Sequence, residues 1–365
     1  MVSKVRKNRQ SNIELLRIVS MLMIVASHYS IHGEFEFNTG ITIPKLWVQW
    51  LQLGGGIGVN IFMLISGYFL INVEKIDFSK ILRYLGQVFF YSFSISTIIK
   101  LFHLSSDLTL TLWLKSLIPL CSGIWWYATA YFLVYLCVPY LNKMLKNITQ
   151  KQHLILILIL FFMWSVVGMF YPEPYAISDV GWLIFLYTIS AYIALYLKNN
   201  KFKHMGIIGF GTYVLLYLSA VFLDVIGKYI SVVAAHETAL FRRNGVVALL
   251  ASIGIFLFFK NLNVKDNKLI NTVASTTFGV YLIHEYPVRS LLWEDIFNNQ
   301  AYANTNSVFI HSVAVIIVVF IVCAIVEFVR QKTVEKIWLK QITKINTKLQ
   351  PRFEKIMNYL VSKSV

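Results

Sequence analysis

Long apolar runs separated by short polar stretches make up most of the chain. Ten runs are about 20 residues long, the length that an α-helix needs to cross a bilayer core of about 30 Å. They cover residues 13–33, 51–71, 81–102, 124–144, 153–171, 180–198, 204–223, 241–260, 272–293 and 307–329. The runs lack the short alternating pattern of barrel strands, and helices satisfy their own backbone hydrogen bonds in lipid. The pattern therefore predicts an all-α polytopic membrane protein with about ten transmembrane helices.

The positive charges alternate from one polar stretch to the next. The N-terminal stretch, every second loop and the stretch from Arg330 onwards hold 25 lysines and arginines, whereas the intervening loops hold seven. Because cytoplasmic loops are enriched in Lys and Arg, this alternation predicts that both termini are cytoplasmic. The net charge of +16 therefore indicates attraction to anionic membrane lipids and not the binding of nucleic acid. We expect a multi-pass protein of the plasma membrane.

The chain divides into a membrane domain at 1–330 and a basic tail at 331–365. In the tail, apolar residues recur at helical spacing with lysines between them, at Val334, Ile337, Trp338, Ile342, Ile345 and Leu349. The spacing predicts an amphipathic cytoplasmic helix that lies on the inner leaflet and is broken at Pro351. A helix that binds a partner protein is the alternative.

The composition excludes a soluble globular enzyme. Of 365 residues, 14% are charged and 57% are hydrophobic, and the mean hydropathy is +0.65. A soluble fold of this size has too little interior to bury that much apolar surface. Cys121, Cys137 and Cys323 all lie in apolar segments without the spacing of a zinc site or a disulfide framework, so we expect no metal.

Three ionisable residues lie in the first apolar run or at its start, where each is costly and is therefore a candidate site residue. Arg17 and His28 are eleven residues apart, which places them within about 20° of one helix face and about 16.5 Å apart along its axis. Glu14 lies one turn before Arg17 and can hold the guanidinium group in place. The alternative is that Arg17 reaches lipid phosphates and that His28 lies at the far membrane interface.

Several segments carry a resemblance to a known family. In chain order they are the acidic residue, Arg and His of the first run (Glu14, Arg17, His28), GVNIFMLISGYFL at 58–70, KILR at 80–83, IWWYATAYFLVYLCVP at 124–139 and FGVYLIHEYP at 278–287. Together they resemble the bacterial acyltransferase-3 family, integral-membrane enzymes that acylate surface sugars. The resemblance covers most of the chain and includes the family's ten helices.

The chain departs from the family pattern at three positions. Glu14 stands where Asp is frequent, Asn60 stands where Asp is common, and Lys80 replaces the first Arg of an Arg-x-x-Arg pair that ends at Arg83. Glu14 and Lys80 keep the charge. Asn60 removes one, so we expect no acid role at position 60.

The resemblance implies a cytoplasmic acyl-CoA donor, most often acetyl-CoA, that acts as a substrate and not as a permanently bound cofactor. His28 matches the family's catalytic position. With an unperturbed pKa of about 6.5, a His suits a general base that takes the proton of an acceptor hydroxyl, and Glu14 is the second catalytic candidate. Arg17, Lys80 and Arg83 are expected at the cytoplasmic mouth, where CoA phosphates need cationic partners. Positive-inside anchoring is the alternative for Lys80 and Arg83.

Four residues expected near the outer side are candidates for binding the acceptor. Trp126 matches a family position and either stacks on a sugar ring or belongs to an aromatic belt. His284 also matches a family position; it orients the acceptor, pairs with Glu285 or is an ordinary interfacial His. Arg242 and Arg243 bind an anionic sugar, a lipid pyrophosphate or the outer headgroups.

These features favour an O-acyltransferase, specifically an acetyl-CoA-dependent O-acetyltransferase that modifies a cell-surface polysaccharide or a lipid-linked glycan. A transporter or flippase for a lipid-linked glycan is the alternative. Transporters commonly contain paired broken helices in two related halves, and the sequence shows no such pairing. A membrane scaffold without activity would leave Arg17 and His28 unexplained.

Overall fold

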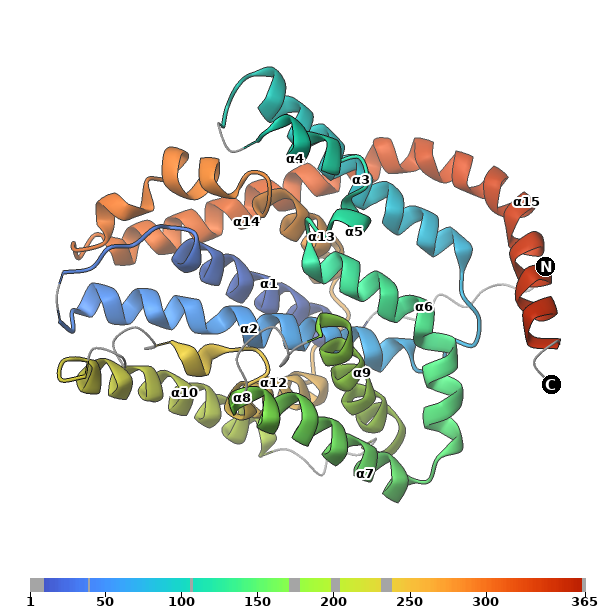
Figure 1. The fold of residues 1–365 in the computed structure, drawn as a ribbon, viewed down its shortest axis with the longest axis horizontal. Helices are drawn as coiled ribbons and strands as arrows, with labels where there is room; N and C mark the ends of the chain where they lie inside the picture. The colour runs from blue at the N-terminus through green and yellow to red at the C-terminus, as the bar shows by residue number, and fades with distance from the viewer. Residues whose placement is uncertain are drawn as a thin grey trace.

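The computed structural model describes residues 10–38, 40–105, 108–170, 178–197, 204–230 and 238–362 (Figure 1). Within these ranges the chain is helical and contains no strand. The prediction of an all-α protein is therefore confirmed.

Each of the ten predicted runs coincides with a helix or a helical stretch. These are α1 (Ser11–Ile31), α2 (Ile43–Leu70), α3 (Phe78–Leu101), α6 (Trp126–Asn147), α7 (Gln150–Phe161) with η1 (Phe162–Val166) and α8 (Val167–Phe170), α9 (Asp179–Tyr196), α10 (Met205–Gly227), α12 (Val246–Asn261), α13 (Lys268–His284) and α14 (Val308–Lys332). The remaining helical segments are α4 (Leu110–Lys115), α5 (Pro119–Ser122), η2 (Ala239–Phe241), η3 (Leu291–Ile296), η4 (Asn299–Tyr302) and α15 (Val334–Ser362).

Five helices of the described residues are long and apolar enough to cross a membrane, namely α1, α2, α9, α10 and α14. The stretch Gln150–Val166 and helix α12 are apolar but shorter. On α14, apolar side chains such as Ile310 and Val322 are exposed, as expected of a surface that faces lipid. These helices identify the chain as a membrane protein.

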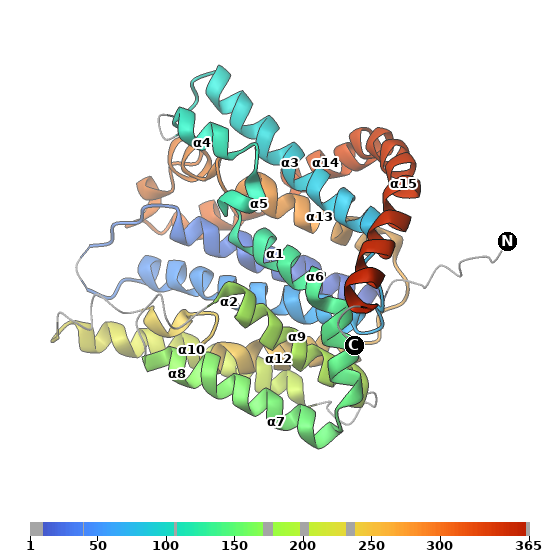
Figure 2. The same ribbon diagram turned by 45° about the vertical axis from the view of Figure 1, so that its right-hand side comes forward.

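Helices α1 and α2 form an antiparallel hairpin through the middle of the molecule (Figure 1). On one side of the hairpin lie α13, α14 and α3, and on the other lie α9, α12 and α10 (Figure 2). Each side has its own buried apolar cluster against the hairpin. Residues on α1 and α2 therefore lie at the centre of the fold, between the two groups of helices.

Glycines on α2 allow the two central helices to approach closely. A Cβ atom added to Gly58 would lie 2.7 Å from the carbonyl oxygen of Ser20, and one added to Gly54 would lie 3.0 Å from Cβ of Met23. The first distance is too short for a real Cβ without a shift of the helices, and the second is tighter than most real Cβ contacts. The glycines thus set the separation of α1 and α2, as small residues do at helix contacts in membranes.

Helix α2 begins at Ile43, eight residues before the predicted run. The Thr42 side chain caps it by accepting a hydrogen bond from the Lys45 backbone N–H, and Pro44 occupies the first turn. Lys45 lies outside the predicted run, so its expected place in a loop is wrong. Its ammonium group lies 3.1 Å from the buried Asp224 carboxylate of α10, so the charged side chain at the start of the helix has an oppositely charged partner.

Helix α13 ends at His284, although the predicted run continued to residue 293. Pro287 follows three residues later, and proline both lacks a backbone N–H and disfavours helical geometry in the residue before it. The chain resumes a helical path only at η3. The early end of α13 leaves Glu285 outside the helix, next to the end of α1.

The predicted break of the tail at Pro351 is also wrong, because Pro351 lies inside α15. A proline removes one backbone hydrogen bond and can bend a helix without ending it. Here α15 packs along α3: Trp338 Nε1 donates to the Leu82 carbonyl at 3.4 Å, and Gln350 Oε1 accepts from the Phe78 backbone N–H at 3.3 Å. These contacts hold the helix up to the residue before the proline.

Candidate functional site

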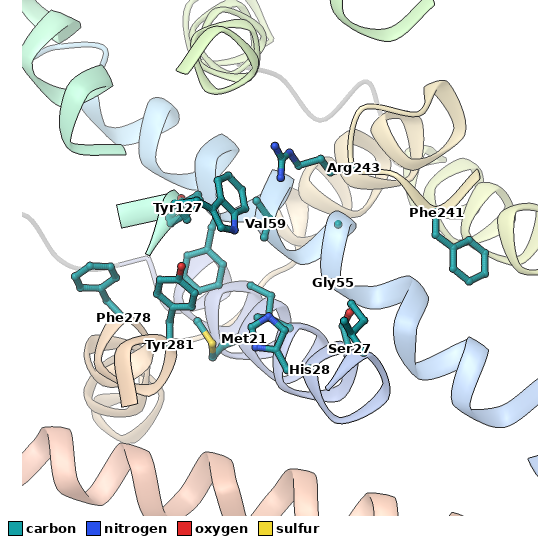
Figure 3. Close-up of a pocket in the computed structure, with 15 residues that line it drawn as sticks. Met21, Ser27, His28, Gly55, Val59, Tyr127, Phe241, Arg243, Phe278 and Tyr281 are labelled. Carbon is teal, nitrogen blue, oxygen red and sulfur yellow. The ribbon is translucent and has the colours of Figure 1, made fainter. Parts of the chain in front are cut away.

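A cavity of about 260 Å³ lies between α1, α2, α6, α13 and the segment that precedes α12, and we call it the central cavity (Figure 3). Its wall is mostly apolar and aromatic. The lining residues are Met21, Ile24, Ser27, His28, Ile31, Gly55, Gly56, Val59, Phe62, Trp126, Tyr127, Phe241, Arg243, Phe278 and Tyr281. The cavity thus brings together three residues that the sequence analysis selected from separate helices: His28, Trp126 and Arg243.

Helix α1 supplies one long wall of the central cavity. Its lining residues run from Met21 to Ile31, which corresponds to about 15 Å along the helix axis. Arg17 lies about one turn before Met21, towards the start of the helix. His28 therefore lies on this wall, whereas Arg17 lies on the same helix just beyond the end of the wall at Met21.

The side chain of His28 belongs to a cluster of four ionisable groups. His28 Nδ1 lies 2.9 Å from Nε2 of His284 and 3.1 Å from Oε2 of Glu285. The same Glu285 oxygen lies 3.4 Å from Nε2 of His32. His284 has no exposed surface, and its Nδ1 lies 2.6 Å from the Val280 carbonyl oxygen. His284 therefore contacts His28 on the side away from the central cavity, which it does not line.

Glu285 also connects the cluster to a second cavity of about 450 Å³. This outer cavity is lined by His32, Glu34, Leu108, Leu112, Tyr286, Pro287, Arg289, Ser290 and Glu294. Oε1 of Glu285 lies 3.7 Å from the Arg289 guanidinium group. Because His28 lines the central cavity while His32 and Arg289 line the outer one, Glu285 lies between the two.

The cluster also has the composition of a cation site. His28, His32 and Glu285 each offer a ligand atom, and these atoms lie within 4.8 Å of one another. Two histidines and a carboxylate are a ligand set that Zn²⁺ uses in proteins. In a metal site His28 Nδ1 would be unprotonated, because a metal ligand must be unprotonated. In a hydrogen-bonded cluster the same nitrogen can carry a proton and donate it.

The predicted contact between Glu14 and Arg17 is present near the start of α1. Arg17 Nε lies 3.4 Å from Glu14 Oε2, and Glu14 is buried. Arg17 also lies close enough to Tyr127 and Tyr131 of α6 for electrostatic interaction. Since Tyr127 lines the central cavity, the guanidinium group is near its inner end.

The structure does not bring Lys80 and Arg83 to Arg17. Both lie on the first two turns of α3 and are exposed. Arg83 Nε lies 3.5 Å from Oε1 of Glu335 on α15, and within the described residues neither side chain forms an ion pair with a group of α1. Arg83 therefore faces the C-terminal helix.

Arg242 and Arg243 have different surroundings although they are adjacent. Arg242 is exposed, whereas the Arg243 guanidinium group lies 4.1 Å from the centre of the Trp126 ring and is paired with Asp179 at the start of α9. The Asn60 side chain donates to the Arg243 carbonyl at 2.8 Å. Asn60 thus has a structural role in holding the backbone of Arg243 at the cavity.

Glu285, His32 and Asp179 are the residues of this site that the sequence analysis did not select as site residues. His32 lies one turn after His28, so its place on the same helix face was visible in the sequence. Glu285 was considered only as a partner of His284. Its contact with His28 depends on the packing of α1 against α13, which a single sequence does not show.

Apolar helices that enclose a cavity, with an imidazole held against a carboxylate at its wall, define a membrane protein with a histidine–carboxylate cluster between its helices. A family model described as an acyltransferase domain matches residues 10–328, and the chain therefore belongs to the acyltransferase-3 family. It is accordingly an acyltransferase, as the resemblance implied. No curated protein and no solved structure matches the chain.

Proposed function

We propose that the protein transfers an acyl group, specifically acetyl, from cytoplasmic acyl-CoA to a hydroxyl of a cell-envelope polysaccharide or lipid-linked glycan. The observation that carries this proposal is the position of His28. Its imidazole lines an apolar cavity, has the Glu285 carboxylate beside it, and shares a helix with Arg17, which lies about one turn before the lining residue Met21. Acetyl-CoA is a substrate in this reaction, and no bound cofactor is required.

The chemistry needs one base at the point where the two substrates meet. His28 takes the proton of the acceptor hydroxyl while the hydroxyl oxygen attacks the thioester carbonyl carbon. The C–S bond then breaks, and the proton passes from the imidazolium to the departing CoA thiolate to give the free thiol. General base catalysis of this kind contributes about 10²- to 10⁴-fold in rate.

The donor end of the site lies at the start of α1. The Arg17 guanidinium group, held by Glu14, is a cationic partner for the phosphates of CoA. The pantetheine arm then extends along the apolar wall from Met21 towards His28. Lys80 and Arg83 add positive charge on the exposed face of α3, where they attract the anionic donor or lipid headgroups.

The acceptor end lies where the start of α6 and the segment before α12 meet the central cavity. Trp126 offers an aromatic face for a sugar ring, and the stacked Arg243 offers hydrogen-bond donors for hydroxyl or anionic groups. Arg242 is exposed and suits contact with headgroups. His284 is buried and contacts His28, so in this proposal it acts on His28 and does not contact the acceptor.

In this proposal ten spans cross the membrane with both termini in the cytoplasm, and contacts between helix ends and loops support the alternation of the spans. Loops predicted on the same side meet one another: the Asn12 side chain donates to the Lys260 carbonyl, and Lys260 Nζ donates to the Leu197 carbonyl. On the opposite side, the Glu36 backbone N–H donates to Gln300 Oε1 at 2.7 Å. These contacts are those expected if successive helices cross the plasma membrane in alternating directions.

The proposal is tested by measuring glycan acetylation by NMR in cells with the wild-type gene, without it, and with His28→Gln. Glutamine keeps a polar group but cannot take up a proton at neutral pH, so we expect no detectable transfer. Purified His28→Gln should still bind acetyl-CoA, whereas Arg17→Ala should bind it about tenfold more weakly through loss of a charge-assisted contact. His153→Gln is the matched control, since His153 is buried and bonded to the Thr188 carbonyl of α9, away from the cavity.

Two results would contradict the proposal. Near wild-type transfer by His28→Gln would show that His28 is not the base. Movement of a glycan lipid across reconstituted vesicles without any acylation would favour a transporter over an acceptor-modifying enzyme.

A further inference from the structure

We infer that His284 and Glu285 are positioning residues that hold His28 in one tautomer, with the proton on Nδ1 and the lone pair on Nε2. The inference rests on the proposed role of His28 as base and adds the groups that prepare it. It follows from the hydrogen-bonding capacity of each atom in the cluster.

The assignment starts at the Val280 carbonyl, which can only accept a hydrogen bond. His284 Nδ1 lies 2.6 Å from this oxygen and must therefore carry a proton. His284 has no exposed surface, and a second proton would place a full charge in a buried position. In the neutral ring Nε2 is then unprotonated and acts as an acceptor.

That acceptor faces Nδ1 of His28 at 2.9 Å. Two unprotonated nitrogens would repel at this distance, so His28 Nδ1 carries the proton and donates it. Oε2 of Glu285, 3.1 Å from the same nitrogen, is also an acceptor when ionised and favours the same arrangement. Both partners of His28 contact Nδ1. The unprotonated Nε2 therefore remains available to a substrate in the central cavity, which His28 lines.

Glu285 has a second effect once the base has taken up a proton. The charged and titratable groups that face His28 are His32 on α1 and His284, Glu285 and Arg289 at the end of α13 and beyond it. Among these, Glu285 is the negative one. Its carboxylate stabilises the imidazolium, as the carboxylate does in a Ser-His-Asp triad, and this stabilisation appears only as the hydroxyl proton is transferred.

A cation held by His28, His32 and Glu285 would require the opposite protonation. Coordination through His28 Nδ1 needs a bare nitrogen there, whereas the tautomer inferred here has Nδ1 protonated. The protonation state of one atom therefore distinguishes the two arrangements.

The direct test is NMR of the full-length protein in detergent micelles with ¹³C,¹⁵N-labelled histidine. The signals of His28 are identified by their loss in His28→Gln. We expect a protonated Nδ1 and an unprotonated Nε2, with no change after dialysis against EDTA. A proton on Nε2, or a change in the His28 signals on chelation, would overturn the inference.

The kinetic test separates positioning from a merely structural role. Glu285→Gln should lower kcat about 10- to 100-fold and leave the KM for acetyl-CoA unchanged, because the charge acts on the reacting proton. His284→Ala should lower kcat as well, and His284→Gln should restore part of it, since the Gln side-chain oxygen can accept from His28 Nδ1. The matched control is His311→Gln, which removes a 2.9 Å bond to Tyr29 near the same end of α1 and should leave kcat within about twofold. Wild-type kcat in both Glu285→Gln and His284→Ala would refute the positioning role.

Failure of this inference is distinguishable from failure of the proposed function. If His28→Gln remains active, His28 is not the base, and the NMR result still decides its tautomer. If His28→Gln is inactive while the wild-type protein shows a proton on Nε2, the proposed function stands and the assignment to His284 and Glu285 is wrong.

Discussion

Arg243 combines three contacts that fix a cationic side chain at the wall of an apolar cavity. Its guanidinium group stacks on Trp126 and pairs with Asp179, and its backbone carbonyl accepts from the buried Asn60 side chain. A cation over an aromatic face is stabilised by the ring quadrupole, more strongly where water is excluded. The neighbouring Arg242 is exposed and provides a natural internal control.

We expect Arg243→Ala to raise the KM for the acceptor about tenfold or more, because a charge-assisted contact contributes about 1.5–3 kcal/mol. Arg242→Ala should change it by less than about twofold, since exposed charges contribute little. Arg243→Lys keeps the charge but loses the planar stacking group and should give an intermediate value. Initial rates against acceptor concentration at saturating acetyl-CoA measure all three. Equal effects of the two alanine variants would contradict the assignment of Arg243 to the acceptor.

Part of the candidate site could be predicted from the sequence because it lies on one helix. Glu14, Arg17 and His28 share α1, and helical geometry alone relates their positions. Glu285 comes next to His28 only because α13 ends at His284 and packs against α1. Contacts between remote helices depend on packing, and neither apolar periodicity nor spacing contains that information.

At the scale of whole helices, a buried ionic network joins α3, α14 and α15. Glu327 on α14 is completely buried, and its carboxylate accepts two 2.8 Å hydrogen bonds from the guanidinium group of Arg330. Tyr91 and Gln87 of α3 donate to the same carboxylate. Arg330 also reaches Glu335 of α15 at 2.6 Å. The network thus fixes the start of α15 against the membrane helices.

We expect Arg330→Met to destabilise the fold by about 3–5 kcal/mol, because it leaves the buried Glu327 carboxylate without its cation. Adding Glu327→Gln should recover much of the loss, since a neutral amide no longer needs that cation and can still hydrogen-bond. The temperature of thermal unfolding in detergent reports both effects. Arg83→Met, which breaks an exposed ion pair with Glu335, is the control and should leave this temperature almost unchanged. A double variant as unstable as Arg330→Met would show that the cation is not the cause.

The helices themselves were predicted from hydropathy, but several of their ends were not. An apolar run locates the middle of a membrane helix, whereas an end depends on caps and on tertiary contacts. Lys45 is polar enough to suggest a loop, yet it lies in the first turn of α2, which Thr42 caps, and its ammonium group pairs with Asp224. Pro351 suggests a break, yet α15 continues through it, and Trp338 and Gln350 hold the part of the helix before the proline against α3.

At the scale of the whole molecule, the proposed function requires that the start of α1 and the acceptor end of the central cavity face opposite sides of the membrane. The donor is made in the cytoplasm, and Arg17 must be reachable from there. His28 lies near the other end of the same helix. The direction of α1 therefore decides whether cytoplasmic acetyl-CoA can enter beside Arg17.

Cysteine labelling in intact cells tests this direction with a matched pair of exposed asparagines. In a background without Cys121, Cys137 and Cys323, Asn147→Cys lies at the end of α6 on the side predicted to be cytoplasmic, and Asn306→Cys lies just before α14 on the opposite side. An impermeant thiol reagent should label Asn306→Cys and leave Asn147→Cys unlabelled until the membrane is permeabilised. The expectation follows from the excess of Lys and Arg on the Asn147 side, which favours retention in the cytoplasm. The reverse labelling pattern would place Arg17 outside the cell and rule out a cytoplasmic acyl-CoA donor at that end of α1.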